Sequence, residues 1–81
     1  MPYVEKHRRE DLTPWEVKRE NPGELNYSIT VLCVDYLKTN GESYHVYNDI
    51  IGALECAKLE MYRRKVADYE NAKMIKNGDV Y

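Results

Sequence analysis

Two cysteines, one tryptophan and no phenylalanine occur among the 81 residues of the chain. Cys33 and Cys56 do not form a CxxC pair, so the sequence offers neither a disulfide framework nor a cysteine-based metal site. Each lies in an apolar helical pattern, and both are expected to be small buried side chains in a reducing compartment. A chain of this length without cross-links has a marginal core, which leaves oligomerisation as the remaining stabiliser.

The charge balance and the hydropathy exclude further classes of protein. The formal net charge of −2 argues against a protein that binds long nucleic acids. No apolar run approaches the ~20 residues of a membrane-spanning helix, and the N-terminus lacks the apolar segment of a signal peptide. We therefore expect a cytoplasmic protein that has no membrane partner.

Motifs for catalysis and metal binding are also missing. There is no glycine-rich phosphate loop and no GxSxG elbow, and His7 and His45 have no motif partners, so no metal and no cofactor are expected. An all-α, Mg²⁺-dependent nucleoside triphosphate pyrophosphohydrolase would need Glu24, Glu55 and Glu60 as metal ligands. On a helix Glu55 and Glu60 point about 140° apart. We expect a non-catalytic protein and keep this enzyme class as an alternative.

Residues 44–76 predict one long helix. They contain no proline and a single internal glycine, Gly52, and are rich in residues that lose little rotamer freedom in a helix. Asn77-Gly78 is a typical helix end because glycine accepts positive φ. A break near residues 67–69 is the alternative.

A second helix is predicted over residues 22–39. Asn21-Pro22-Gly23-Glu24 combines an N-cap residue, a proline at the first helical position and a glutamate three residues after the cap. Asn40-Gly41 ends this helix. A short loop at 41–43 follows, in which Ser43 or a neighbour caps the long helix, so the two helices are expected to form an antiparallel hairpin.

The first 21 residues are expected to form an N-terminal arm. Thr13-Pro14-Trp15-Glu16 has the form of a capping box and predicts a short helix that ends before Asn21, since the residue before a proline avoids helical geometry. The basic cluster Lys6–Arg9 is placed on a short helical turn. The expected organisation is one all-α domain with an arm at 1–21, helices at 22–39 and 44–76, and a tail at 77–81.

The long helix is too long for a compact monomer of this size. About 30 helical residues span roughly 45 Å, whereas a compact 81-residue chain is only about 30 Å across. The apolar pattern shows two stripes on different faces, which suits a helix between two neighbours. One stripe is Ile50, Leu54, Ala57 and Met61, and the other is Leu59, Tyr62, Val66 and Tyr69. We expect a homo-oligomeric helical bundle, with a monomeric three-helix fold as the alternative.

Tyr62-Arg63-Arg64-Lys65 is the most specific chemical pattern in the chain. Guanidinium groups bind phosphate in a bidentate manner, and a tyrosine ring stacks on a base. This pattern predicts a small anionic, nucleotide-like ligand held between subunits. The alternative is a solvated helix face on which Arg63 pairs with Glu60 or Glu70. Weaker candidates for the same ligand are Lys58, Asn26, Tyr27, Arg8 and Arg9.

Three separated segments resemble a group of short phage and prophage proteins. They are GELNYSIT at 23–30, IGALECAKLEMYRR at 51–64 and the terminal NGDVY at 77–81. The resemblance covers residues 23–81 and implies a viral or mobile-element setting, and it supplies no catalytic residues. Small helical oligomers from this setting often bind a host factor or signal. Anti-defence sponges, which sequester the cyclic nucleotides of Thoeris or CBASS immunity, are one such class by analogy of size and setting alone.

The function expected from the sequence is therefore sequestration, by a homo-oligomer, of an anionic nucleotide-like immune signal. The second hypothesis is an inhibitor or modulator of a host protein that binds through a tyrosine-rich surface, since the chain has eight tyrosines. The pyrophosphohydrolase is the third.

Overall fold

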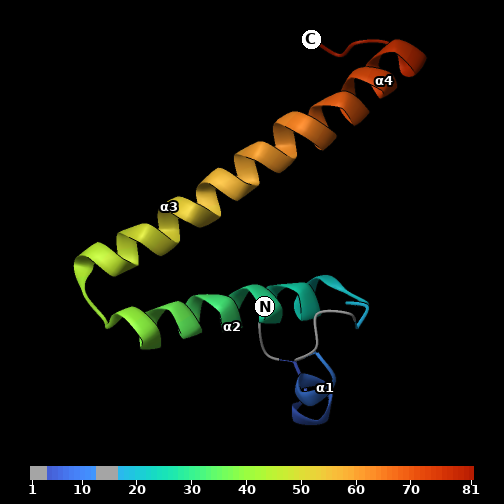
Figure 1. The fold of residues 1–81 in the computed structure, drawn as a ribbon. Helices are drawn as coiled ribbons and strands as arrows, with labels where there is room; N and C mark the ends of the chain where they lie inside the picture. Colours follow the sequence, from blue (N-terminus) through green and yellow to red (C-terminus); the bar gives the residue numbers. More distant parts are fainter. Residues whose placement is uncertain (1–3, 13–16) are drawn as a thin grey trace. The chain divides into compact units, whose positions relative to one another are not determined.

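The computed structural model describes residues 4–12 and 17–81, and all regular structure in these two ranges is helical (Figure 1). The all-α class, with a short N-terminal helix and a long C-terminal one, is confirmed. The chain divides into two compact units, residues 1–46 and 47–81. In chain order the elements are α1 (Lys6–Asp11), α2 (Pro22–Asn40), α3 (Tyr44–Met61), the π-helical turn η1 (Tyr62–Val66) and α4 (Ala67–Asn77).

Helix α2 begins and ends at the signals that the sequence contains. The side-chain oxygen of Asn21 accepts a hydrogen bond from the backbone N–H of Glu24 at 2.9 Å, with Pro22 in the first turn. At the other end Gly41 has φ +82°, and its N–H donates to the carbonyl of Leu37 at 2.8 Å. These caps satisfy backbone groups that the helix itself leaves unpaired.

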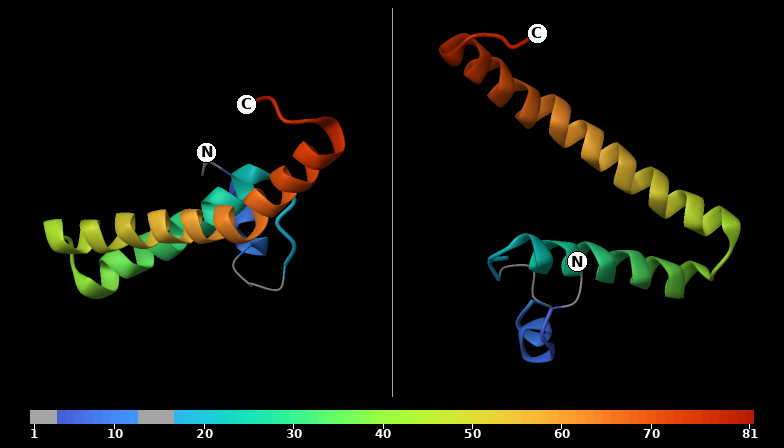
Figure 2. Two further views of the ribbon diagram at one scale, coloured as in Figure 1. Left: turned by 90° about the horizontal axis from the view of Figure 1, so that it is seen from above. Right: turned by 180° about the vertical axis from the view of Figure 1, so that it is seen from behind.

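Residues 44–77 form a continuous helix that runs through α3, η1 and α4 (Figures 1 and 2). The hydroxyl of Ser43 accepts the N–H of Val46 at 3.2 Å, as expected for a cap. Gly78 has φ +91° and donates its N–H to the carbonyl of Met74 at 2.9 Å, which ends the helix. Residues 67–69 belong to α4, so the alternative of a break there is wrong. The irregularity lies just upstream, in η1.

The N-terminal arm differs from the sequence-based expectation. The predicted capping box at 13–16 lies outside the described residues. The helix predicted to follow it is wrong over Val17–Glu20, which is irregular. Side chains take up the backbone groups of this segment instead. Arg8 donates to the carbonyl of Lys18 at 3.0 Å, and the N–H of Glu20 donates to the carboxylate of Glu24 at 2.9 Å.

Arg19 holds the same segment against α2. Its guanidinium donates to the hydroxyl of Ser28 at 2.9 Å, to the carbonyl of Val17 at 2.5 Å and to the carbonyl of Leu12. A helix that ended at residue 20 would use the N–H of Glu20 for its own ladder, and this N–H donates to Glu24 instead. The bond to Glu24 and the guanidinium bonds of Arg8 and Arg19 hold the segment in its irregular conformation.

Few side chains are buried. Among the described residues the buried apolar side chains are Leu12 and Val46, and the buried polar ones are Glu24 and Ser28. No side chain in residues 47–81 is buried. The expectation of two buried cysteines is accordingly wrong, because Cys33 is half-buried and Cys56 is exposed. Cys56 lies in a unit that consists of one helix and a short tail, which by itself has no second element to cover it.

Candidate ligand-binding residues

The predicted basic and aromatic segment coincides with the π-helical turn η1. Its hydrogen bond joins the N–H of Ala67 to the carbonyl of Tyr62, five residues back instead of four. Such a turn accommodates one more residue than an α-helical turn, and single π turns inside α-helices are rare and frequent at functional sites. The basic and aromatic segment therefore lies at a structurally distinct point of the long helix.

Two arginines in η1 share one carboxylate. Arg63 Nη2 lies 2.6 Å from Glu60 Oε2, and Arg64 Nε binds Glu60 Oε1. The side chains of Arg63 and Arg64 are 72% and 71% exposed. The pairing of Arg63 with Glu60, which the sequence left open as an alternative, is thus observed, and Arg64 binds the same carboxylate. One carboxylate balances only one of the two positive charges of Arg63 and Arg64, so this pair of arginines has excess positive charge in a chain whose net charge is −2.

Tyr62 and Lys58 also have partners on their own helix. The hydroxyl of Tyr62 donates to the carboxylate of Glu70, and this hydrogen bond, with the negative charge of Glu70, raises the pKa of Tyr62. The ammonium of Lys58 lies 3.1 Å from Glu55, and both side chains are more than half exposed. Exposed ion pairs of this kind contribute little free energy and exchange easily for another anion.

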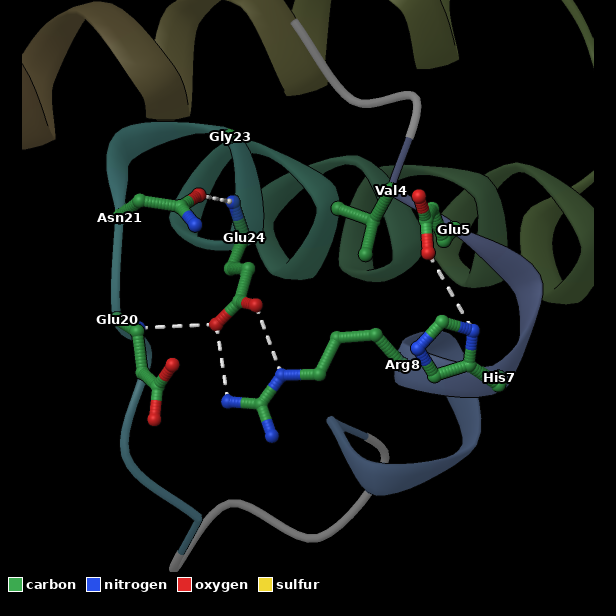
Figure 3. A pocket seen from close by; sticks show the side chains of 8 residues that line it. All are labelled: Val4, Glu5, His7, Arg8, Glu20, Asn21, Gly23 and Glu24. Carbon is green, nitrogen blue, oxygen red and sulfur yellow. Dashed lines mark hydrogen bonds and ion pairs between the residues drawn. The ribbon is translucent and has the colours of Figure 1, made fainter.

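A group of ion-pair and hydrogen-bond contacts in the N-terminal unit is centred on Glu24 (Figure 3). Arg8 binds its carboxylate with two donors, Nε at 2.8 Å and Nη2 at 3.0 Å. The N–H of Glu20 is a third donor to the same carboxylate. The Arg8 guanidinium, followed by the N–H of Glu20, lowers the pKa of Glu24, and the bond to Glu24 raises the pKa of Arg8. We call Arg8, Glu20, Asn21 and Glu24 the Glu24 cluster.

An open hollow of about 430 Å³ lies beside this cluster (Figure 3). Its lining contains three carboxylates, from Glu5, Glu20 and Glu24, and the cationic side chain of Arg8 is already bound to one of them. His7 lies 3.5 Å from Glu5 and adds positive charge only when protonated. The lining is therefore acidic on balance, which does not favour an anionic ligand.

The remaining sequence-based candidates have local partners in the same unit. The guanidinium of Arg9 lies 5.8 Å from the centroid of the Tyr27 ring, and its Nε donates to the carbonyl of Val4 at 2.6 Å. The hydroxyl of Thr30 donates to the backbone carbonyl of Asn26 at 2.8 Å and to its side-chain oxygen at 3.2 Å. The predicted residues thus form two groups. Arg8, Arg9, Asn26 and Tyr27 lie in the first unit, and Lys58, Tyr62, Arg63 and Arg64 lie in the second.

The sequence did not reveal the role of Glu24. In the structure this residue fixes the N-terminal arm on α2. Its position three residues after an N-cap was the available signal, but a capping glutamate normally returns to the N-cap residue. Here it binds the N–H of Glu20, one residue earlier, and the guanidinium of Arg8. A distant arginine partner has no sequence signature.

The proposed Mg²⁺ ligands of a pyrophosphohydrolase are engaged with cations. Glu24 binds Arg8, Glu55 pairs with Lys58, and Glu60 binds two arginines. Within residues 4–12 and 17–81, no group of three or more His, Cys, Asp or Glu side chains is arranged to hold a metal ion. In the same ranges, the helices are too short or too polar for a membrane span.

The chain belongs to a protein family described as a domain of unknown function (DUF6899), whose family model matches residues 1–80. No curated protein and no solved structure matches the chain. The family membership covers almost the whole sequence and assigns no activity.

Proposed function

We propose that this protein is a non-catalytic binder that sequesters a small anionic, nucleotide-like ligand on the long helix, at the face formed by Glu60, Arg63 and Arg64, with Tyr62 and Lys65 next to it in sequence. The observation that carries the proposal is the charge imbalance at the π turn. Two exposed guanidinium groups share the single carboxylate of Glu60, and Lys65 follows directly. A phosphate group offers each arginine a bidentate partner, which the shared carboxylate does not.

The chemistry of the neighbouring side chains suits a nucleotide more than inorganic phosphate. The ring of Tyr62 is adjacent to the arginines in sequence and half exposed, and an exposed ring stacks on a base. The resemblance to short phage proteins supplies the biological setting, in which the ligand is a cyclic nucleotide signal of host immunity. The proposal requires no catalytic group.

Isothermal titration calorimetry against cyclic dinucleotides, cyclic trinucleotides and cyclic ADP-ribose isomers tests the proposal. We expect binding to at least one of them, and we expect Arg63→Ala to weaken it about tenfold, because a charge-assisted hydrogen bond contributes about 1.5–3 kcal/mol and exposure reduces this. Lys73→Ala is the matched control, since Lys73 is a cation of the same helix whose ammonium lies 5.6 Å from the Tyr69 ring. If none of these ligands gave a heat of binding, the proposal would be refuted.

A second function, modulation of a host protein, is favoured by the exposed aromatic side chains. Tyr44 and Tyr69 are 80% and 64% exposed, and tyrosine is enriched at protein interfaces. A stoichiometric host protein that is retained equally by the native chain and by Arg63→Ala would favour this function over nucleotide binding.

A further inference from the structure

The apolar side chains of the long helix have no cover within residues 47–81. In that unit Leu54 is 39%, Met61 60% and Tyr69 64% exposed. A helix that is not covered does not gain from these side chains, since most helical stability in proteins comes from packing an amphipathic face. The helix therefore needs an occupant for its apolar face.

The π turn determines which side chains of the long helix lie on that apolar face. At about 100° per residue, Ile50, Leu54, Ala57 and Met61 fall within about 60° of one another on α3. In an uninterrupted α-helix, Val66 and Tyr69 would lie roughly 90–150° round the helix from the middle of this group. The additional residue of η1 turns everything after it back by about 100°, which brings both side chains into line.

A hydrogen bond in the structure shows the same offset. Tyr62 binds Glu70, eight residues further on. In an α-helix, side chains seven residues apart lie one above the other after two turns, so alignment at eight residues requires one extra residue between them. Val66 and Tyr69 of the second stripe thus join the first stripe in one face, whereas Leu59 and Tyr62 do not. We call it the seam, and it consists of Ile50, Leu54, Ala57, Met61, Val66 and Tyr69.

We propose that the seam binds the same seam of a second copy of this chain in antiparallel orientation. The distribution of charge along the helix favours a second copy of the chain as the partner and the antiparallel orientation. Residues 47–59 contain two acidic side chains and one basic one, whereas residues 60–77 contain five basic and three acidic side chains. An antiparallel pair places each acidic half beside a basic half, and also opposes the two helix dipoles. A parallel pair in register places like charges together.

The side-chain sizes along the seam are compatible with a two-fold axis near residues 59–60. In an isologous interface residue i contacts residue j and residue j contacts residue i. The axis sets Ile50 opposite Tyr69, Leu54 opposite Val66, and Ala57 opposite Met61. Ala57, the smallest side chain of the seam, thereby contacts Met61, which is long and flexible. This contact lies close to the axis, where the helices approach most closely.

This pairing does not depend on the proposed function. Glu60 lies about 100° round the helix from the middle of the seam, so the carboxylate and its two arginines stay accessible on each copy. An anion site exposed on each copy replaces the sequence-based expectation of a site between subunits. A paired protein that binds no nucleotide would contradict the proposed function alone.

Two glutamate substitutions test the seam. Leu54→Glu places a charge in the seam, and Ile75→Glu places one on an 82% exposed apolar residue of the same helix that lies outside the seam. Sedimentation equilibrium is expected to give a dimer for the native chain and for Ile75→Glu, and a helical monomer for Leu54→Glu. A native monomer, or a Leu54→Glu variant that associates as tightly as the native chain, would overturn the proposal.

A distance between the two copies tests the orientation. In a Cys33→Ser, Cys56→Ser background, Lys76→Cys carries a single spin label for pulsed electron paramagnetic resonance. Residue 76 lies about 16 residues from the axis, so the antiparallel pair places the two labels roughly 50 Å apart at 1.5 Å per residue. A parallel pair in register places them about 10–15 Å apart, near the spacing of packed helices, and that result would overturn the antiparallel arrangement. Unchanged molar mass of the double serine variant is the control.

Discussion

Insertion of one alanine after Lys65 is the sharpest perturbation of the seam, because the π turn already accommodates one additional residue. A second additional residue is expected to continue the helix instead of widening the same turn further. Residues 66–77 then rotate by about 100° relative to α3, and Val66 and Tyr69 leave the seam. Helix content is expected to stay the same.

The loss of Tyr69 from the interface sets the size of the effect. Tyr69 is 64% exposed in the isolated chain. A fully buried aromatic side chain removes about 200 Å² from water, so Tyr69 offers about 130 Å² and at most roughly 3 kcal/mol at ~25 cal/mol per Å². Two copies give at most about 6 kcal/mol, or about four orders of magnitude in the dimer dissociation constant.

Sedimentation equilibrium measures this constant, and circular dichroism reports whether the helix is intact. Deletion of Lys65 is the matched control, since an ordinary α-helix then closes with Val66 and Tyr69 at the same angle to α3. We expect the insertion to dissociate the dimer and the deletion to leave it assembled. If the insertion variant associates like the native chain, or the deletion dissociates the dimer, the π turn does not align the seam, and the reasoning fails.

Two further predictions concern the first unit and the glycines. The pKa of Glu24 is lowered in the folded chain, so its contribution to stability is present above its unfolded pKa of about 4.3 and is lost as pH falls through the lower folded value. Thermal unfolding should therefore show the melting temperature of Glu24→Gln well below that of the native chain at neutral pH, with the gap closing in acid; a gap independent of pH would contradict the role of Arg8. Gly52→Ala should stabilise the chain by about 0.5–1 kcal/mol, since no atom lies within 4 Å of the added Cβ and the position is helical. Gly41→Ala, also in open space but at φ +82°, should destabilise it by about 1–2 kcal/mol in the same assay, and equal effects of the two substitutions would refute the backbone explanation.

Local signals in the sequence predicted the helices well, because they act over a few residues. Asn21 and Gly41 delimit α2, and Ser43 and Gly78 delimit the long helix, each through bonds to residues three or four positions away. The basic segment at 62–65 was also singled out, for its chemistry.

Features that depend on distant partners or on helical phase were not predicted from the sequence. A helix was predicted at residues 17–20, but the carboxylate of Glu24, which lies on α2, accepts the N–H of Glu20. The π turn has no composition signal of its own, so Val66 and Tyr69 were assigned to a second stripe on another face. Cys56 was expected to be buried on its apolar pattern alone, although burial requires an element that covers it.

The molar mass of the unmodified protein tests most directly whether a second chain covers the long helix. Light scattering over a micromolar concentration range, with helix content followed in parallel, is predicted to give about twice the 9.6 kDa of one chain. A well-folded helical species of 9.6 kDa at every concentration would contradict the account.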